Sequence, residues 1–264
     1  MSQAPLAISS RDNPLLQRLR KLVRDAGAYR NSAEVWLEGE HLCSALRARG
    51  QRPAQALVAE SAWQRPALRA LAGWAPRIAL VPDALFDGIS VLDSPARIGF
   101  VLALPASPAI DACAPSIVLD RVQDAGNVGS ILRSASAFGF SQVLCLQGTA
   151  LLWSPKVLRA GMGAHFGLQL IEGLKPADLQ ALSLPWVGTS LQATQWLHGA
   201  ALPQPCAWVF GHEGQGVDPA LLARCALTVR IAQPGGEESL NVAAAAAVCL
   251  HESMRRMAAS APGQ

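Results

Sequence analysis

The stretch GGEESLNVAAAAAV, residues 235–248, places Ser239-Leu240-Asn241 after a diglycine and before a run of five alanines. Alanine strongly favours helix, and Asn241 or Ser239 can accept hydrogen bonds from the free N–H groups at a helix start. We therefore expect a helix from Val242 to about Met257. Helix propensity explains the alanines but not the glycine-rich entry. The small residues indicate that a ligand or another backbone approaches this part of the chain closely.

Short apolar runs upstream of this stretch predict a sheet. Each run has the length of a buried strand and is followed by turn residues or a helical pattern. This arrangement is typical of an α/β fold with a largely parallel sheet covered on both faces. The runs are SIVLD (116–120), QVLCL (142–146), PWVGTSL (185–191), AWVFG (207–211) and LTVRIA (227–232).

A smaller α/β domain is predicted in front of this sheet. Residues 11–30 place one apolar stripe on a helix with arginines opposite. The stripe consists of Leu15, Leu16, Leu19, Leu22 and Val23, and strand signals follow at EVWLEG, ALVAE, IALVP and FVLAL. The segment LPASPAIDACAP is punctuated by prolines, as linkers are. We predict a small domain at 1–105, a linker at 106–115 and a second domain at 116–264.

Composition and charge narrow the class of protein. With 51% hydrophobic and 16% charged residues, the chain is globular, because disordered chains carry more charge and less apolar surface. Residues 1–77 hold twelve Arg and Lys against six Asp and Glu, whereas residues 78–264 hold ten against thirteen. A basic N-terminal part followed by a mildly acidic remainder indicates that the N-terminal part binds a polyanion. A solvated surface rich in arginine would give the same count.

Cysteine usage indicates a reducing compartment. The six cysteines are scattered without a Cys-x-x-Cys pair, which argues against a disulfide framework or a zinc site. The start of the chain lacks the basic and apolar regions of a secretory signal, and Pro, Gly and Gln interrupt the longest uncharged stretches. We expect a cytoplasmic protein without a metal ion or a membrane span.

The first stretch with chemistry is LDRVQDAGNVGSILRSASAFG, residues 119–139. A strand ends, Asn127 can cap the following helix, and Gly139 suits its C-terminal end. The predicted buried stripe is Val128, Ile131, Leu132, Ala135 and Phe138. Arg133 lies off that stripe beside serines and alanine, which leaves room for an anionic ligand. A solvated helix arginine is the alternative.

The second stretch is AWVFGHEGQGVDPALL, residues 207–222. Glycines at the C-terminal end of a strand let a ligand lie against the backbone, where sites form in α/β sheets. The spacing Gly-x-x-Gly-x-Gly, from Gly211 to Gly216, is the wrong order for a dinucleotide fingerprint, and no Gly-Lys-Ser phosphate loop is present. This disfavours a nicotinamide-dependent enzyme. A plain turn remains the alternative for this segment alone.

Taken together, three motifs in order resemble the SpoU (TrmH-like) branch of the SPOUT RNA methyltransferases. They are Asn-x-Gly-x-x-x-Arg, Phe-Gly-x-Glu-x-x-Gly and Ile-x-x-Pro-x-Gly-x-x-Ser-Leu-Asn-Val, within residues 116–257. Residues 6–104 resemble the RNA substrate-binding domain that precedes the catalytic domain in ribosomal RNA members. The chain departs from the family pattern at Ala125, at RAGMGAHF (159–166) and at Ala232-Gln233.

The resemblance implies a fold and a cofactor. The fold is a SPOUT α/β domain whose C-terminal segment is threaded into a deep trefoil knot, which is rare among proteins. The knotted backbone would enclose S-adenosylmethionine, and the domain would form a homodimer. Carried over residue by residue, the cofactor-binding positions are Thr189, Gly211, Ile231 and Leu240.

The resemblance also implies transfer of a methyl group to a ribose 2′-hydroxyl of RNA. Arg133 would hold a phosphate and stabilise the developing alkoxide, because a guanidinium hardly ever acts as a base. Asn127 and Glu213 would orient Arg133 and the nucleotide, and Ser239 and Asn241 would order the loop between cofactor and substrate. Ribosomal RNA is favoured over transfer RNA because of the leading domain. A transfer RNA enzyme of the same family and a non-catalytic RNA-binding or assembly protein are the alternatives.

Overall fold

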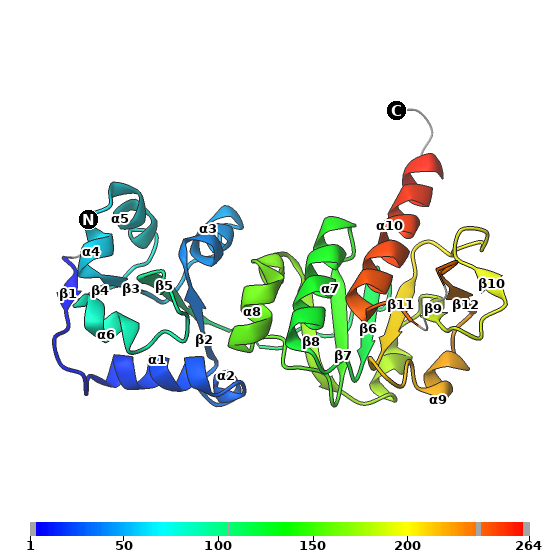
Figure 1. Ribbon diagram of the computed structural model, residues 1–264, viewed down its shortest axis with the longest axis horizontal. Helices are drawn as coiled ribbons and strands as arrows, with labels where there is room; N and C mark the ends of the chain where they lie inside the picture. The colour runs from blue at the N-terminus through cyan, green and yellow to red at the C-terminus, as the bar shows by residue number, and fades with distance from the viewer. Residues whose placement is uncertain (1–3, 105, 236–238, 261–264) are drawn as a thin grey trace. The chain divides into compact units, whose positions relative to one another are not determined.

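The computed structural model describes residues 4–104, 106–235 and 239–260 and divides into two compact units (Figure 1). Unit 1 comprises Met1–Ala106 together with Trp153–Phe166, and unit 2 comprises Ser107–Leu152 together with Gly167–Gln264. The domain bounds expected from the sequence, with a linker at 106–115, stay a prediction. The segment Trp153–Phe166, which contains the unusual RAGMGAHF run, groups with unit 1.

Unit 1 is a small mixed sheet with helices. Its strands β1 and β3 pair with β4 in parallel, while β5 pairs antiparallel with β3 and β2. In the order of the sheet they are β1 (Leu6–Ala7), β4 (Ile78–Val81), β3 (Gln55–Ala59), β5 (Ile98–Ala103) and β2 (Glu34–Glu38). The helices are α1 (Pro14–Arg24), α2 (Ala28–Ser32), α3 (Glu40–Ala48), α4 (Glu60–Trp63), α5 (Pro66–Ala72), α6 (Asp83–Asp87) and α8 (Pro155–Gly161).

Helix α1 forms as its sequence predicts. The side chain of Asn13 accepts a hydrogen bond from the N–H of Leu15, and Pro14 occupies the first turn, where a missing N–H costs nothing. Four of the five predicted stripe residues are buried, and Leu15 is half-buried. The first turn holds no acidic residue and the last turn carries Lys21 and Arg24, which suits the negative end of the helix dipole.

Unit 2 is built on a sheet of seven parallel strands. In the order of the sheet they are β10 (Gln195–Trp196), β12 (Leu227–Arg230), β9 (Trp186–Thr189), β11 (Ala207–Gly211), β6 (Ser116–Asp120), β7 (Gln142–Leu146) and β8 (Gln169–Leu174). Every residue of β6, β7 and β11 is buried, as expected of central strands covered on both faces. The predicted α/β fold with a mostly parallel sheet is confirmed, whereas the knot stays a prediction.

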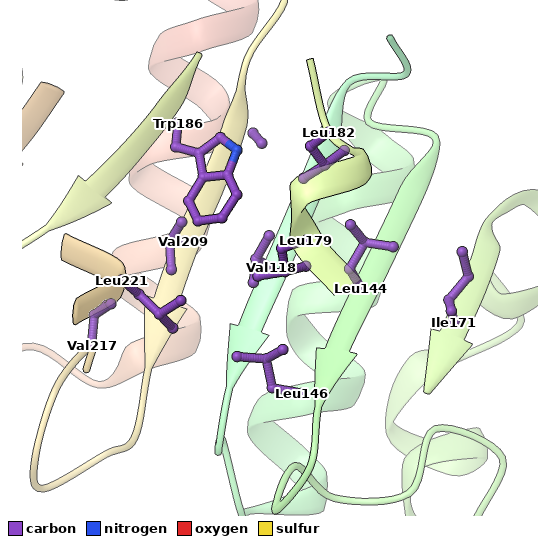
Figure 2. Close-up of a cluster of buried hydrophobic side chains, with 11 residues drawn as sticks. Val118, Leu144, Leu146, Ile171, Leu179, Leu182, Trp186, Val209, Val217 and Leu221 are labelled. Carbon is purple, nitrogen blue, oxygen red and sulfur yellow. The ribbon is translucent and has the colours of Figure 1, made fainter. Parts of the chain in front are cut away.

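One face of this sheet carries the core cluster drawn in Figure 2. Val118 of β6, Leu144 of β7 and Val209 of β11 contribute to it from the strands. Leu179 of the short 3₁₀ helix η2 (Asp178–Ala181) and Leu182, which follows it, complete the cluster. The short helix α9 (Pro219–Leu222) adds Leu221. Small elements, η2 and α9 among them, therefore help to cover this face.

On the other face, α7 (Ala125–Ala137) and α10 (Val242–Ser260) pack against each other, as Figure 1 shows. The indole N–H of Trp208, a buried residue of β11, donates a 2.9 Å hydrogen bond to the hydroxyl of Ser253. Arg255 and Arg256 form ion pairs with Glu252 one turn earlier, and Arg256 also donates to the carbonyls of Leu197 and His198. These bonds hold the last turns of α10, which ends at Ser260, three residues after its predicted end near Met257. Among the described residues, no helix combines the length and apolar character that crossing a membrane requires.

Glu252 generates a prediction about pH. The hydrogen bond from Arg255 lowers the pKa of Glu252 to about 2, with a further contribution from Arg256 that burial only partly opposes. Because this is below the ordinary value of 4.5, the carboxylate stabilises the fold above pH 4.5, and that contribution is lost as pH falls toward 2. We expect Glu252→Gln to lower the free energy of unfolding by about 1 kcal/mol at pH 6, measured by urea unfolding.

The difference between the Glu252→Gln variant and the native chain should then shrink steadily as pH falls below 4.5. Glu60→Gln is the control, because Glu60 is exposed and makes no ion pair among the described residues. A difference that stays constant from pH 6 to pH 2.5 would show that the charge of Glu252 does not stabilise α10.

Candidate cofactor-binding and catalytic site

A cavity of about 530 Å³ opens at the carboxyl ends of β9, β11 and β12. The ends of parallel strands at a sheet edge are where α/β proteins place their ligands. All four predicted cofactor-binding residues line this cavity, together with Glu213 and Ser239. The four are Thr189 at the end of β9, Gly211 at the end of β11, Ile231 directly after β12, and Leu240 before α10. The structure thus brings together segments that are far apart in the sequence.

Position 211 requires glycine because the backbone of residues 216–217 lies against it. A Cβ atom at this position would lie 2.2 Å from the carbonyl carbon of Gly216 and from the nitrogen of Val217. The loop folds back because the N–H of Gly216 donates to the carbonyl of His212, and the ring Nδ1 of His212 accepts from Gly214 and Gln215. The folded-back loop, residues 212–217, forms part of the cavity wall.

Beside the cavity, three side chains from three separate motifs form a hydrogen-bonded chain. The amide nitrogen of Asn241 donates to Asn127 Oδ1 at 2.9 Å, and the amide nitrogen of Asn127 donates to Glu213 Oε1 at 3.1 Å. Asn241 Oδ1 also accepts from the N–H groups of Ala243 and Ala244, so Asn241 caps α10 as predicted. The start of α10 is therefore tied to α7 and to the loop after β11.

Glu213 is held as a charged carboxylate. Burial raises the pKa of Glu213, but hydrogen bonds from the side chain of Asn127 and from the N–H groups of Asp124 and Gln123 outweigh it, so the net pKa is lowered. A group with a lowered pKa is a weak base near neutral pH. Glu213 is therefore suited to orient its partners rather than to take a proton.

The cap of α7 differs from the prediction. The helix begins at Ala125, and Asp124 Oδ1 accepts the N–H of Asn127 at 2.7 Å, so Asp124 is the cap and Asn127 lies inside the first turn. The prediction that Asn127 caps this helix is wrong. Aspartate is an equally good cap, and its use frees the amide of Asn127 for Glu213 and Asn241.

Arg133 stands apart from the cavity. It is exposed on α7, does not line the cavity, and makes no hydrogen bond or ion pair within the described ranges 4–104, 106–235 and 239–260. Arg133 follows Asn127 by six positions, which places the two side chains about 120° apart around the helix. Its guanidinium is therefore available to a ligand that lies over α7.

Two residues of the cavity wall were not predicted from the sequence. Arg230 and Gln233 line the cavity, and the Arg230 guanidinium lies 3.7 Å from the centroid of the Trp196 ring. Arg230 directly precedes Ile231, a predicted ligand contact, and Gln233 follows it by two positions, so their places in the sequence could have drawn attention to them. Groups of three or more potential metal ligands are absent from the described part of the chain.

Comparisons with known proteins agree with this geometry. The family model of the SpoU rRNA methylase family matches residues 114–251. An uncharacterised tRNA/rRNA methyltransferase of Synechocystis is 32% identical over 268 residues, covering 97% of each chain. The Bacillus subtilis 23S rRNA (guanosine(2553)-2′-O)-methyltransferase RlmP is 31% identical over 175 residues, which are 65% of this chain and 70% of that one.

Solved structures cover the residues of both units. A crystal structure of an RNA 2′-O ribose methyltransferase has a TM-score of 0.80 and 28% identity, covering 96% of this chain and 100% of its own. The SpoU methyltransferase AviRb from Streptomyces viridochromogenes, in complex with the cofactor AdoMet, has a TM-score of 0.79 and 25% identity, covering 94% and 100%.

The hydrogen bonds that link the side chains of Asn241, Asn127 and Glu213 generate a prediction. Replacing Asn127 with alanine removes the side-chain donor that lowers the pKa of Glu213, so the pKa of Glu213 should rise. The measurement is a carbon-13 NMR titration of labelled glutamate carboxyls. Gln123→Ala is the matched control, because Gln123 bonds Glu213 through its backbone N–H, which the substitution keeps. Equal pKa values of Glu213 in the native chain and the Asn127→Ala variant would contradict the role given to Asn127.

Proposed function

Because the chain belongs to the SpoU rRNA methylase family, we propose that it transfers a methyl group to a ribose 2′-hydroxyl of ribosomal RNA. The observation that carries this proposal is the convergence of all three motifs on one cavity and its rim. The names of similar proteins, including 23S rRNA 2′-O-methyltransferases, support ribosomal RNA as the substrate class.

The cavity suits S-adenosylmethionine, which supplies a methyl group on a sulfonium sulfur when bound. Gly211 keeps the wall of the cavity at the level of the main chain, so backbone groups can reach the cofactor. Thr189, Ile231 and Leu240 would contact it from three neighbouring segments. Arg230 and Gln233 bring two further polar side chains to the wall of the cavity.

The residues around the cavity would align the ribose and stabilise charge. A 2′-hydroxyl is a poor nucleophile, so its oxygen must be held in line with the methyl carbon and stabilised as it loses its proton. Arg133 would hold the neighbouring phosphate and stabilise the alkoxide, while water or a phosphate oxygen accepts the proton. Glu213 and Asn127 would orient the nucleotide, and Ser239 and Asn241 would order the segment between cofactor and RNA.

Unit 1 would hold the RNA. The excess of basic residues within 1–77 suits contacts with phosphates, and a 2′-hydroxyl target requires RNA rather than DNA. We further propose that unit 2 forms a homodimer and that its C-terminal segment is knotted, as the family resemblance implied. A ribosomal RNA substrate also agrees with the cytoplasmic location expected from the sequence.

Replacing Arg133 with alanine tests the catalytic assignment. We expect the rate of methylation to fall by about 100-fold or more, because one charged group that stabilises a transition-state oxyanion is removed. The dissociation constant for S-adenosylmethionine, measured by calorimetry, should stay unchanged, because Arg133 does not line the cavity. Arg224→Ala is the control, since Arg224 is an exposed arginine of unit 2 that packs on Trp186. Normal methylation by the Arg133→Ala variant would refute the assignment.

The proposed RNA contacts should depend strongly on salt. Each phosphate contact releases counterions, so RNA affinity should fall by about tenfold or more between 50 and 200 mM salt. Fluorescence anisotropy with a labelled ribosomal RNA fragment measures this dependence. If the RNA affinity did not change with salt concentration, unit 1 would not bind RNA through its phosphates. Mapping of 2′-O-methyl groups in total RNA would identify the target nucleotide.

A further inference from the structure

Arg121 holds a backbone conformation that non-glycine residues rarely adopt. It follows directly after β6 and has a φ of 58°, in the left-handed region. Such conformations persist in proteins where the surrounding structure requires them, and they gather at functional sites. The three hydrogen bonds that the Arg121 side chain donates, two to Asp120 and one to Gln215, indicate why this conformation is required.

The left-handed turn brings Arg121 back onto its own neighbour. Its Nε donates to Asp120 Oδ1 at 2.8 Å, and its second terminal nitrogen donates to Asp120 Oδ2 at 3.0 Å. Adjacent residues of an extended strand point to opposite faces, so this two-pronged pair forms only because the chain turns here. Asp120 is buried, and Gly148 leaves the space that the arginine stem occupies, since a Cβ there would lie 3.1 Å from Arg121 Cγ.

The same two side chains fasten the loop after β11. Arg121 donates to Gln215 Oε1 at 3.0 Å, and Asp120 Oδ2 accepts the N–H of Asp218 at 2.8 Å. At the near end of the loop, Glu213 accepts from the N–H groups of Gln123 and Asp124. Residues 212–217 between these points form one wall of the cavity and include two glycines, which have no side chains to anchor them.

We propose that Asp120 and Arg121 are positioning residues for the cofactor. Resting on the proposed function, the inference is that their ion pair holds the loop of residues 212–218 in its binding shape before S-adenosylmethionine arrives. Neither side chain lines the cavity, so both act through the loop. Preorganising a wall in this way improves affinity, because binding then orders less of the chain.

The test is calorimetric binding of S-adenosylmethionine to the full chain and its variants. Arg121→Lys keeps the charge but cannot bond both oxygens of Asp120 and Gln215 at once. We expect its dissociation constant to rise by about tenfold, in line with the loss of one or two charge-assisted hydrogen bonds. The KM for the cofactor should rise in parallel, and the KM for RNA should stay unchanged. In the absence of ligand, hydrogen exchange at the backbone amides of Gly214 to Val217 should be faster in the Arg121→Lys variant than in the native chain.

Further variants separate positioning from stability. Arg121→Gly removes the clamp and relieves the left-handed strain, but it leaves the buried carboxylate of Asp120 without its cation, so affinity and the unfolding midpoint should both fall. Gln215→Ala, at an exposed position, should weaken binding in the same direction and keeps the test valid if an Arg121 variant does not fold. Adding Gln215→Glu to Arg121→Lys should restore part of the affinity. Arg224→Lys should leave the dissociation constant unchanged.

The outcomes distinguish this inference from the function on which it rests. If the native chain binds S-adenosylmethionine and Arg121→Lys, Arg121→Gly and Gln215→Ala bind it equally tightly, the positioning role is wrong and the proposed function stands. If the native chain does not bind S-adenosylmethionine, the proposed function fails and this inference fails with it.

Discussion

The site depends on the close approach of two backbone segments at the end of β11. Gly211 lies so near the backbone of Gly216 and Val217 that no side chain fits between them. The following loop folds back over the strand end, and its residues 212–217 form part of the wall of the cavity. Hydrophobic burial of the central strands fixes where β11 ends, and the missing side chain fixes how the loop leaves it. The remaining groups of the site are arranged around this geometry.

Fixed hydrogen bonds, rather than titrating groups, organise the polar part of the site. Glu213 stays charged because three donors converge on it, and its charge in turn orients the amide of Asn127. On the far side of the same loop, the pair of Asp120 and Arg121 holds the backbone from outside the cavity. A site that is preorganised in this way suits a reaction in which alignment and charge stabilisation supply most of the rate acceleration.

The sequence predicted the elements that have strong local signals. The central strands are apolar runs, and the start of α10 carries its cap in Asn241. The strands β1 and β10 were missed because each has only two residues, both exposed, and β8 because Glu172 and Gly173 interrupt its apolar pattern. Local pattern also could not choose Asp124 over Asn127 as the cap of α7. The clamp formed by Arg121 depends on a contact across 94 residues, which no local pattern contains.

The alanines before the buried part of α10 also set a length. Asn241 must face Asn127 while Ala246, Cys249 and Leu250, farther along the same helix, are buried. A helix turns by about 100° per residue, so deleting or inserting one alanine would rotate the first group away from the second. Substitutions between small residues leave this phase intact, whereas a change in their number does not. Residues 243–245, which lie between Asn241 and the first of these buried residues, therefore act as a spacer whose count is constrained more tightly than its composition.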